Sequence, residues 1–222
     1  MPKVTEEYIQ TKKQAIINAF LAVCEKKVLY EITMTDVIKE INISKGGIYR
    51  YFEDLDDLLV SSLNQQSSNE NFYTILDKII KPETSSSDNL QKLFVFLGEY
   101  VESNVSVIGK IQYELTAMLA SQPDRQKKIL GRLNEQAQGQ YWMKQVMIQI
   151  SKGIESGEFT PLFSIEVILS FMSGAIDGIT GSIINQCYYQ KIKKETLNIP
   201  KLFEALNISV LSLLTGGKSN ES

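Results

Sequence analysis

The strongest constraint on the fold of this 222-residue chain is a pair of short helical patterns with three residues between them. Four apolar residues of the first pattern recur at spacings of three and four: Met34, Val37, Ile38 and Ile41. The second pattern follows Ser44, a favourable helix N-cap, and its apolar residues are Ile48, Tyr51 and Phe52. Such spacings place apolar side chains on one face of a helix. We therefore expect helices at 34–41 and 45–52 joined by a tight turn.

Capping signals support both ends of the first helix. Thr33 and Asp36 are spaced as a capping box in which Asp takes the place of Glu. Asn42 tolerates the left-handed backbone conformation that ends many helices. A further helix is expected to begin after Asp54, a second favourable N-cap, because leucines at spacings of one, three and four follow it.

The Gly46-Gly47 pair at the start of the second pattern has three interpretations. A Gly-Gly hairpin needs alternating strands on both sides, whereas the periods on both sides are helical. A phosphate-binding loop normally follows a buried strand, and no strand pattern precedes these glycines. The remaining interpretation is a helix-turn-helix whose second helix opens with Ser-Lys-Gly-Gly.

The rest of the chain also has helical periods, and no run of alternating residues predicts a sheet. The predicted helices span 5–27, 34–41, 45–52, 55–80, 89–104, 106–121, 124–156, 163–188 and 200–215. The predicted fold class is all-α, with an N-terminal three-helix helix-turn-helix domain and a larger helical C-terminal domain. The expected boundaries are 5–54 for the first domain, 55–80 for a connecting helix, 81–216 for the second domain and 217–222 for a flexible tail.

Composition excludes several kinds of active site. The chain has no histidine, which removes Ser-His and Cys-His nucleophile pairs and every histidine-based zinc site. No catalytic constellation, metal site or cofactor motif is present, so we expect neither an enzyme nor a bound cofactor. Cys24 and Cys187 lie in apolar helical patterns and are expected as free thiols in a reducing compartment. The apolar stretch 165–184 contains Glu166 and Asp177, so we expect a buried helix of a cytoplasmic protein and no membrane span.

A helix-turn-helix places its second helix in the major groove of double-stranded DNA. Each of the two glycines costs about 1 kcal/mol of helix propensity relative to alanine, a cost that is explained if a side chain would hold the backbone away from DNA. Lys45 and Arg50 add positive charge, and arginine can also read guanine. The predicted DNA contacts are Thr33, Thr35, Lys39, Ser44, Lys45, Gly46, Gly47, Tyr49, Arg50 and Tyr51. Tyr51 and Phe52 also suit the core, and we place Phe52 there.

Residues 33–59 closely resemble the DNA-binding domain of the TetR/AcrR family of bacterial transcriptional regulators. The residues that carry the resemblance include Thr33, Asp36, Ser44, Gly46, Tyr49, Tyr51 and Phe52. The sequence departs from the family at Asn42, where glycine is usual, at Gly47, where threonine is common, and at Leu55, where lysine is usual. The resemblance implies a regulator, usually a repressor, whose C-terminal domain dimerises and often binds a small effector.

The sequence supports a homodimer independently. Small residues recur every four positions in one predicted helix, and apolar residues recur at spacings of three and four in the last one, as in helix-packing seams. The predicted interface is Phe171, Gly174, Gly178, Ser182, Phe203, Leu206, Val210 and Leu213. The alternative is that both stripes pack within one chain.

An effector pocket is predicted from aromatic residues and methionines that suit an adaptable apolar cavity, with Glu114 as a partner for a cationic group. The predicted lining is Phe94, Tyr113, Glu114, Met118, Trp142, Met143 and Met147, and the expected effector is small and apolar or amphipathic. The alternative is that these residues are plain core, and that Glu114 is simply exposed.

The leading functional hypothesis is a sequence-specific DNA-binding regulator, a repressor released from its operator by a small molecule. One alternative is a regulator that works without an effector or with a protein partner. An alternative of another class is a helical small-molecule carrier or enzyme whose DNA-binding motif is vestigial. The intact segment from Ser44 to Phe52 favours the regulator.

Overall fold

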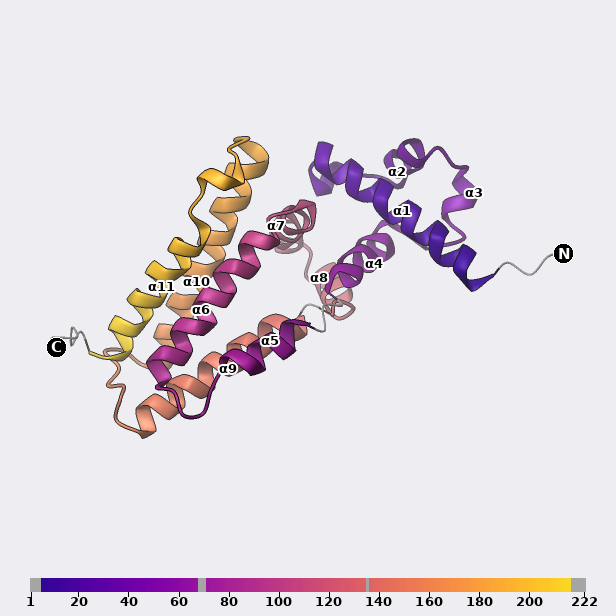
Figure 1. Cartoon of the computed structure of the whole chain (residues 1–222). Helices are drawn as coiled ribbons and strands as arrows, with labels where there is room; N and C mark the ends of the chain where they lie inside the picture. The colour runs from indigo at the N-terminus through magenta and orange to yellow at the C-terminus, as the bar shows by residue number, and fades with distance from the viewer. Residues whose placement is uncertain (1–4, 68–70, 135, 217–222) are drawn as a thin grey trace. The chain divides into compact units, whose positions relative to one another are not determined.

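The computed structural model describes residues 5–67, 71–134 and 136–216, and these residues form helices and no strands (Figure 1). The all-α prediction is confirmed. The α-helices are α1 (Glu6–Lys26), α2 (Met34–Ile41), α3 (Lys45–Ile48), α4 (Leu55–Ser67), α5 (Asn71–Ile79), α6 (Ser86–Ser103), α7 (Val107–Leu119), α8 (Pro123–Leu130), α9 (Gln136–Glu155), α10 (Ile165–Ile184) and α11 (Ile199–Leu214). Short 3-10 helices span Leu29–Glu31 and Lys194–Thr196, and a π-helical turn spans Asn185–Tyr189.

The helices form two compact units. The first contains α1 to α4 together with α7 and α8, and the second contains α5, α6 and α9 to α11. The units therefore do not follow the expected boundaries at 54 and 81, because α7 and α8 pack with the N-terminal helices. The expected tail at 217–222 lies outside the described residues, as do residues 68–70 of the expected connecting helix.

The core of the first unit is built from the predicted apolar stripes. Met34 and Val37 of α2 are buried, and Ile38 and Ile41 pack against them at partial burial. Phe52 is only 2 % exposed, which confirms its predicted place in the core. The helix-turn-helix is thus held by apolar burial on its inner face, which leaves its outer face available for contacts.

Two glycines set helix packing in the second unit. A Cβ on Gly98 of α6 would lie 3.1 Å from the Phe203 Cβ and 3.3 Å from the Pro200 Cα, so α6 and α11 approach closely at this point. A Cβ on Gly153 of α9 would lie 2.2 Å from the ring of Phe159. Phe159 is buried, and its ring occupies the space that a side chain at 153 would need.

The prediction of one helix at 124–156 is wrong. Helix α8 ends at Leu130, next to Gly131, and α9 begins at Gln136. The segment between them is held by Asn64 of α4, whose Nδ2 donates to the Arg132 carbonyl at 2.7 Å and whose Oδ1 accepts the Asn134 N–H at 2.8 Å. A tertiary contact therefore replaces helical hydrogen bonds here.

Other helix ends also shift. The helix predicted at 45–52 ends at Ile48, and the N–H groups of Tyr51 and Phe52 bond to the Ile48 carbonyl in a turn. Two glycines give this short helix little intrinsic propensity. The helix predicted at 89–104 begins at Ser86, and the α-helical part of the one predicted at 163–188 runs over Ile165–Ile184.

Hydrogen bonds to the first N–H groups of α6 explain its early start. Ser85 Oγ accepts the Asp88 N–H at 3.0 Å, and the Glu158 carboxylate accepts the N–H groups of Ser86 and Ser87 at 2.9 and 2.8 Å. Burial opposes ionisation of Glu158, but the hydrogen bonds from Ser87 and Ser86 outweigh it and lower its pKa. The carboxylate thus stabilises the positive end of α6.

Candidate nucleic-acid interface

Helix α2 begins with the predicted capping box. Thr33 Oγ1 accepts the Asp36 N–H at 3.3 Å, and Asp36 Oδ2 accepts the Thr33 N–H at 2.9 Å. The Lys27 ammonium donates to Asp36 Oδ1 at 2.7 Å. Hydrogen bonds from Lys27 and Thr33 lower the pKa of Asp36 from 3.8 to about 2. Helix α2 ends at Ile41, and the C-cap Asn42 has a φ of 56°, which confirms the predicted left-handed conformation.

Helix α3 is capped by Ser44, whose Oγ accepts the Gly47 N–H at 3.2 Å. A Cβ on Gly47 would lie 3.2 Å from that same oxygen, so the cap itself explains this glycine. A Cβ on Gly46 would have nothing within 4 Å. Packing within the described chain therefore does not require glycine at 46, and the position is open to contact with another molecule.

Most of the predicted DNA contacts lie on the surface. The exposed ones are Thr33, Thr35, Lys39, Ser44, Lys45, Gly46, Tyr49 and Arg50, whereas Gly47 and Tyr51 are half-buried. Tyr51 packs against the core of the first unit, so its inner part has a structural role. Tyr49 is 43 % exposed, and the Lys45 ammonium lies 6.0 Å from the centroid of its ring. The helix-turn-helix thus presents hydroxyls, a phenol ring and cations on one continuous segment.

Ion pairs neutralise acidic residues on both sides of α3. On the α2 side, Lys26 pairs with Glu40 at 2.9 Å. On the α4 side, Arg125 and Arg132 each lie 2.6 Å from an aspartate, Asp56 and Asp57 respectively. Partly exposed pairs of this kind add little stability, but they reduce negative charge near α3. Among the described residues no ion pair involves Lys39, Lys45 or Arg50.

The ion pair between Arg125 of α8 and Asp56 of α4 was not predicted from the sequence. Arg125 donates to both carboxylate oxygens of Asp56 through Nε, at 3.2 and 3.1 Å. The pair joins residues 69 positions apart, so no local pattern could connect them. The only signal was compositional: a basic stretch near 125–132 and an acidic stretch near 53–57.

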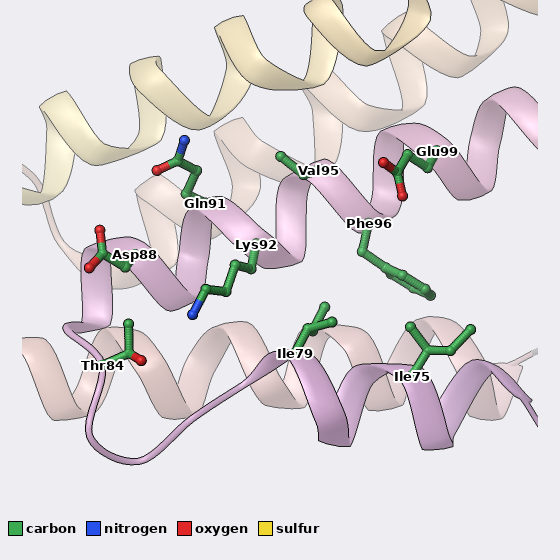
Figure 2. A pocket seen from close by; sticks show the side chains of 9 residues that line it. All are labelled: Ile75, Ile79, Thr84, Asp88, Gln91, Lys92, Val95, Phe96 and Glu99. Carbon is green, nitrogen blue, oxygen red and sulfur yellow. The ribbon is translucent and has the colours of Figure 1, made fainter.

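A groove of about 460 Å³ lies between α5 and α6 in the second unit (Figure 2). Figure 2 shows Ile75 and Ile79 directed from α5 toward α6, and Phe96 directed from α6 toward α5. The Lys92 side chain extends toward the loop that carries Thr84. The complete lining is Ile75, Ile79, Thr84, Asp88, Gln91, Lys92, Val95, Phe96 and Glu99. The groove combines an apolar base with one cation and two acids at its edges.

None of the seven predicted pocket residues lines this groove. Phe94 and Trp142 are buried and pack edge to face at 5.5 Å, which is a core contact. Met143 packs beside the same core at partial burial, and Met147 is exposed. These four lie in the second unit.

Tyr113, Glu114 and Met118 lie in the first unit instead. Tyr113 is exposed, and Met118 packs against the first core. Glu114 is buried and paired with Lys110 at 2.9 Å, so it is neither exposed nor available to a cationic ligand.

No protein-family model matches the chain. It is 23 % identical over 201 residues to the uncharacterized HTH-type transcriptional regulator YfiR of Bacillus subtilis, covering 87 % of this chain and 89 % of that protein. It is 21 % identical over 215 residues to the fatty acid metabolism regulator protein of Bacillus subtilis, covering 95 % and 97 %.

Solved structures of transcriptional regulators have a similar fold. A TetR transcription regulator from Haloarcula marismortui matches with a TM-score of 0.59 and 15 % identity over 93 % of this chain and 98 % of that one. The transcriptional regulator FadR from Bacillus subtilis in complex with stearoyl-CoA matches with a TM-score of 0.53 and 19 % identity over 93 % and 99 %. The chain has the TetR-family fold. Both compact units are needed for such coverage, so the likeness is not confined to the helix-turn-helix.

The predicted dimer residues of this TetR-family fold divide into two groups. Phe203, Leu206 and Val210 of α11 are at most 5 % exposed because they pack inside the second unit, so their place at an interface is wrong. Leu213 is half-buried. The α10 residues of the prediction are exposed: Phe171, Gly174, Gly178 and Ser182.

The α10 group belongs to a larger apolar surface that the sequence analysis did not identify. Phe163, Val167 and Phe171 are 47–55 % exposed, and Ile208 of α11 is 61 % exposed. The three α10-side residues Phe163, Val167 and Phe171 line an apolar hollow of about 260 Å³ together with Ile168, Ser209 and Leu213. We call the exposed residues Phe163, Val167, Phe171, Gly174, Gly178 and Ile208 the α10–α11 face.

The helical stretch Ile165–Tyr189 is long and apolar enough to cross a membrane, and only 28 % of its most apolar window is buried within the described chain. The expectation that the chain itself buries this helix is therefore wrong. The α10–α11 face is open among the described residues.

Proposed function

We propose that this protein is a sequence-specific DNA-binding transcriptional regulator that acts in the cytoplasm as a homodimer. The observation that carries the proposal is Gly46: it lies at the exposed start of α3, and nothing in the described chain explains it. The TetR-family fold supports it, as does the similarity to the HTH-type regulator YfiR and to the fatty acid metabolism regulator protein. Arg50, Lys45 and Lys39 are the residues that would contact the operator.

A homodimer fits both the DNA and the surface of the second unit. One half-site seldom gives the affinity or specificity that a regulator needs, and a two-fold dimer matches two half-sites about 34–36 Å apart. The α10–α11 face is apolar and open, and its small residues Gly174 and Gly178 would allow another helix to approach closely. Two copies that pair these helices would form a four-helix interface.

We propose that a small amphipathic effector releases the operator. Regulators similar to this chain support the idea, because one of them was solved with stearoyl-CoA. The α5–α6 groove would hold an apolar chain against Ile75, Ile79 and Phe96, with Lys92 near an anionic group. Release then follows if the effector prefers a different half-site separation from the one DNA requires.

The DNA-binding proposal is tested by fluorescence anisotropy with duplexes from the regions that flank the gene, beside a scrambled duplex at one salt concentration. Arg50→Ala should weaken selective binding by about 1–3 kcal/mol per half-site. The exposed Lys144 of the second unit supplies a control of equal charge change, and Lys144→Ala should bind as the wild type does. Equal loss in both variants would show that only net charge matters.

The effector proposal is tested by adding stearoyl-CoA or stearate to the operator complex. Loss of anisotropy is expected for the wild type, and Ile79→Glu should abolish the response without changing operator affinity. A complex that neither compound dissociates would favour an effector-independent or protein-partnered regulator.

A further inference from the structure

The first unit contains a buried ion pair between Lys110 and Glu114 of α7. Their side chains are only 5 % and 8 % exposed, and the Lys110 ammonium lies 2.9 Å from Glu114 Oε1. The same ammonium donates to the carbonyls of Cys24 and Lys27, each at 2.8 Å. Glu114 Oε2 accepts the Leu29 N–H at 2.7 Å. Both charges are therefore used to hold backbone groups between residues 24 and 29.

These backbone groups lie where α1 ends and the helix-turn-helix begins. The last carbonyls of a helix have no intrahelical partner, and an ammonium there is also favoured by the helix dipole. Helix α1 ends at Lys26, so Lys110 caps its C-terminus. Leu29 opens the 3-10 helix Leu29–Glu31, and Glu114 accepts the N–H at its start.

The held segment continues into α2 through two side chains. Lys26 pairs with Glu40 at 2.9 Å, and Lys27 pairs with Asp36 at 2.7 Å. Asp36 belongs to the capping box of α2, and three residues separate the end of α2 from the start of α3. A continuous set of contacts thus runs from the buried pair on α7, through the end of α1, to the first and last turns of α2.

A buried ion pair often adds little net stability, because the cost of desolvating two charges offsets their attraction. Replacing both partners by apolar residues of similar volume is often neutral or stabilising, whereas removing one leaves an uncompensated buried charge. The three hydrogen bonds to the α1 end fix one geometry, which an apolar contact would not. The pair therefore differs from an ordinary core contact because it fixes the position of the end of α1 relative to α7.

We propose that Lys110 and Glu114 are positioning residues for operator binding: they fix the end of α1 on α7 and thereby set where α2 and α3 meet the DNA. Neither side chain is exposed on the helix-turn-helix surface, so the effect is indirect. The proposal rests on the proposed DNA-binding function.

The test uses the full-length double variant Lys110→Met/Glu114→Leu, with the exposed α7 pair Tyr113→Met/Ala117→Leu as a control at the same spacing. The double variant should lose less Tm than Lys110→Met alone, because it leaves backbone groups unpaired but no uncompensated buried charge. Lys110→Met alone should lose about 10 °C. The double variant should bind the operator at least about fivefold more weakly, with unchanged affinity for a scrambled duplex because the exposed cations remain.

Cys24 supplies a readout that does not depend on DNA. Burial raises the pKa of its thiol to about 12, with Lys110 opposing the increase and Glu114 adding to it, and the residue is 1 % exposed. In a Cys187→Ser background, the reaction of Cys24 with DTNB should be at least tenfold faster in the double variant than in the wild type or the control.

The outcomes separate the two proposals. A folded double variant with wild-type operator affinity, or with an unchanged Cys24 reaction rate, overturns the positioning role. A wild type that binds operator and scrambled duplexes equally contradicts the DNA-binding function instead, and the Cys24 rates still decide whether the pair fixes the end of α1.

Discussion

Gly46→Ala should change stability and DNA binding in opposite directions. In the unbound protein the new methyl group would have nothing within 4 Å. Alanine favours a helix over glycine by about 1 kcal/mol, which for a chain of this size raises Tm by about 2–4 °C. On the operator the methyl would lie between α3 and DNA.

The loss of affinity can be estimated from crowding at packed contacts. Inserting a methyl-sized group into such a contact costs about 1–3 kcal/mol. A dimer carries two copies of Gly46, so even the lower value gives about 2 kcal/mol, or about 30-fold weaker binding. The expected result is a protein that melts later and binds the operator less tightly.

Gly139 supplies the matched control for this prediction. It is a helical glycine of α9 whose added Cβ would also have nothing within 4 Å. Gly139→Ala should gain a similar Tm and leave operator affinity unchanged. The assays are thermal melting at fixed protomer concentration and anisotropy at fixed salt. If Gly46→Ala binds the operator as Gly139→Ala does, the explanation of Gly46 by DNA contact is refuted.

Three further predictions test other parts of the molecule. Gly153→Ala should lower stability by about 1–3 kcal/mol, because its methyl would overlap the Phe159 ring, and a melt beside Gly139→Ala measures this. Asp36 has a lower pKa in the folded chain (about 2) than its ordinary 3.8, so its contribution to stability is present above pH 4 and lost as the pH falls toward 2. The Tm difference between wild type and Asp36→Asn should therefore shrink over that window; a constant difference would contradict the assignment. Phe171→Glu should make the protein monomeric by light scattering, whereas a variant that stays dimeric would place the interface elsewhere.

Local chemistry explains which parts of the fold could be predicted from the sequence. The capping box of Thr33 and Asp36 and the left-handed Asn42 depend on neighbours within four residues, and both were predicted and are present. The break after Leu130 depends on Asn64, whose contact with residues 132–134 cannot be found in any local pattern. Gly131 was the one available signal.

Periodicity identifies an apolar face but not what covers it. The stripe of Phe203, Leu206 and Val210 has the spacing of a dimer seam, yet it packs inside the second unit. Phe171 of α10 was predicted at the same interface, and it is 47 % exposed. In the same way, an acidic residue in an apolar turn indicated that Glu114 binds a ligand. Only its ion pair with Lys110 shows that its role is structural.

In the proposed function, the exposed face of α2 and α3 binds a specific DNA sequence as part of a two-fold dimer. The most direct measurement is selection by the purified wild-type protein from a pool of random duplexes, with Arg50→Ala run in parallel. We expect enrichment of a pseudo-palindrome whose half-sites are about one helical turn apart, and loss of this enrichment with Arg50→Ala. A folded, dimeric wild type that enriches no sequence would contradict the claim.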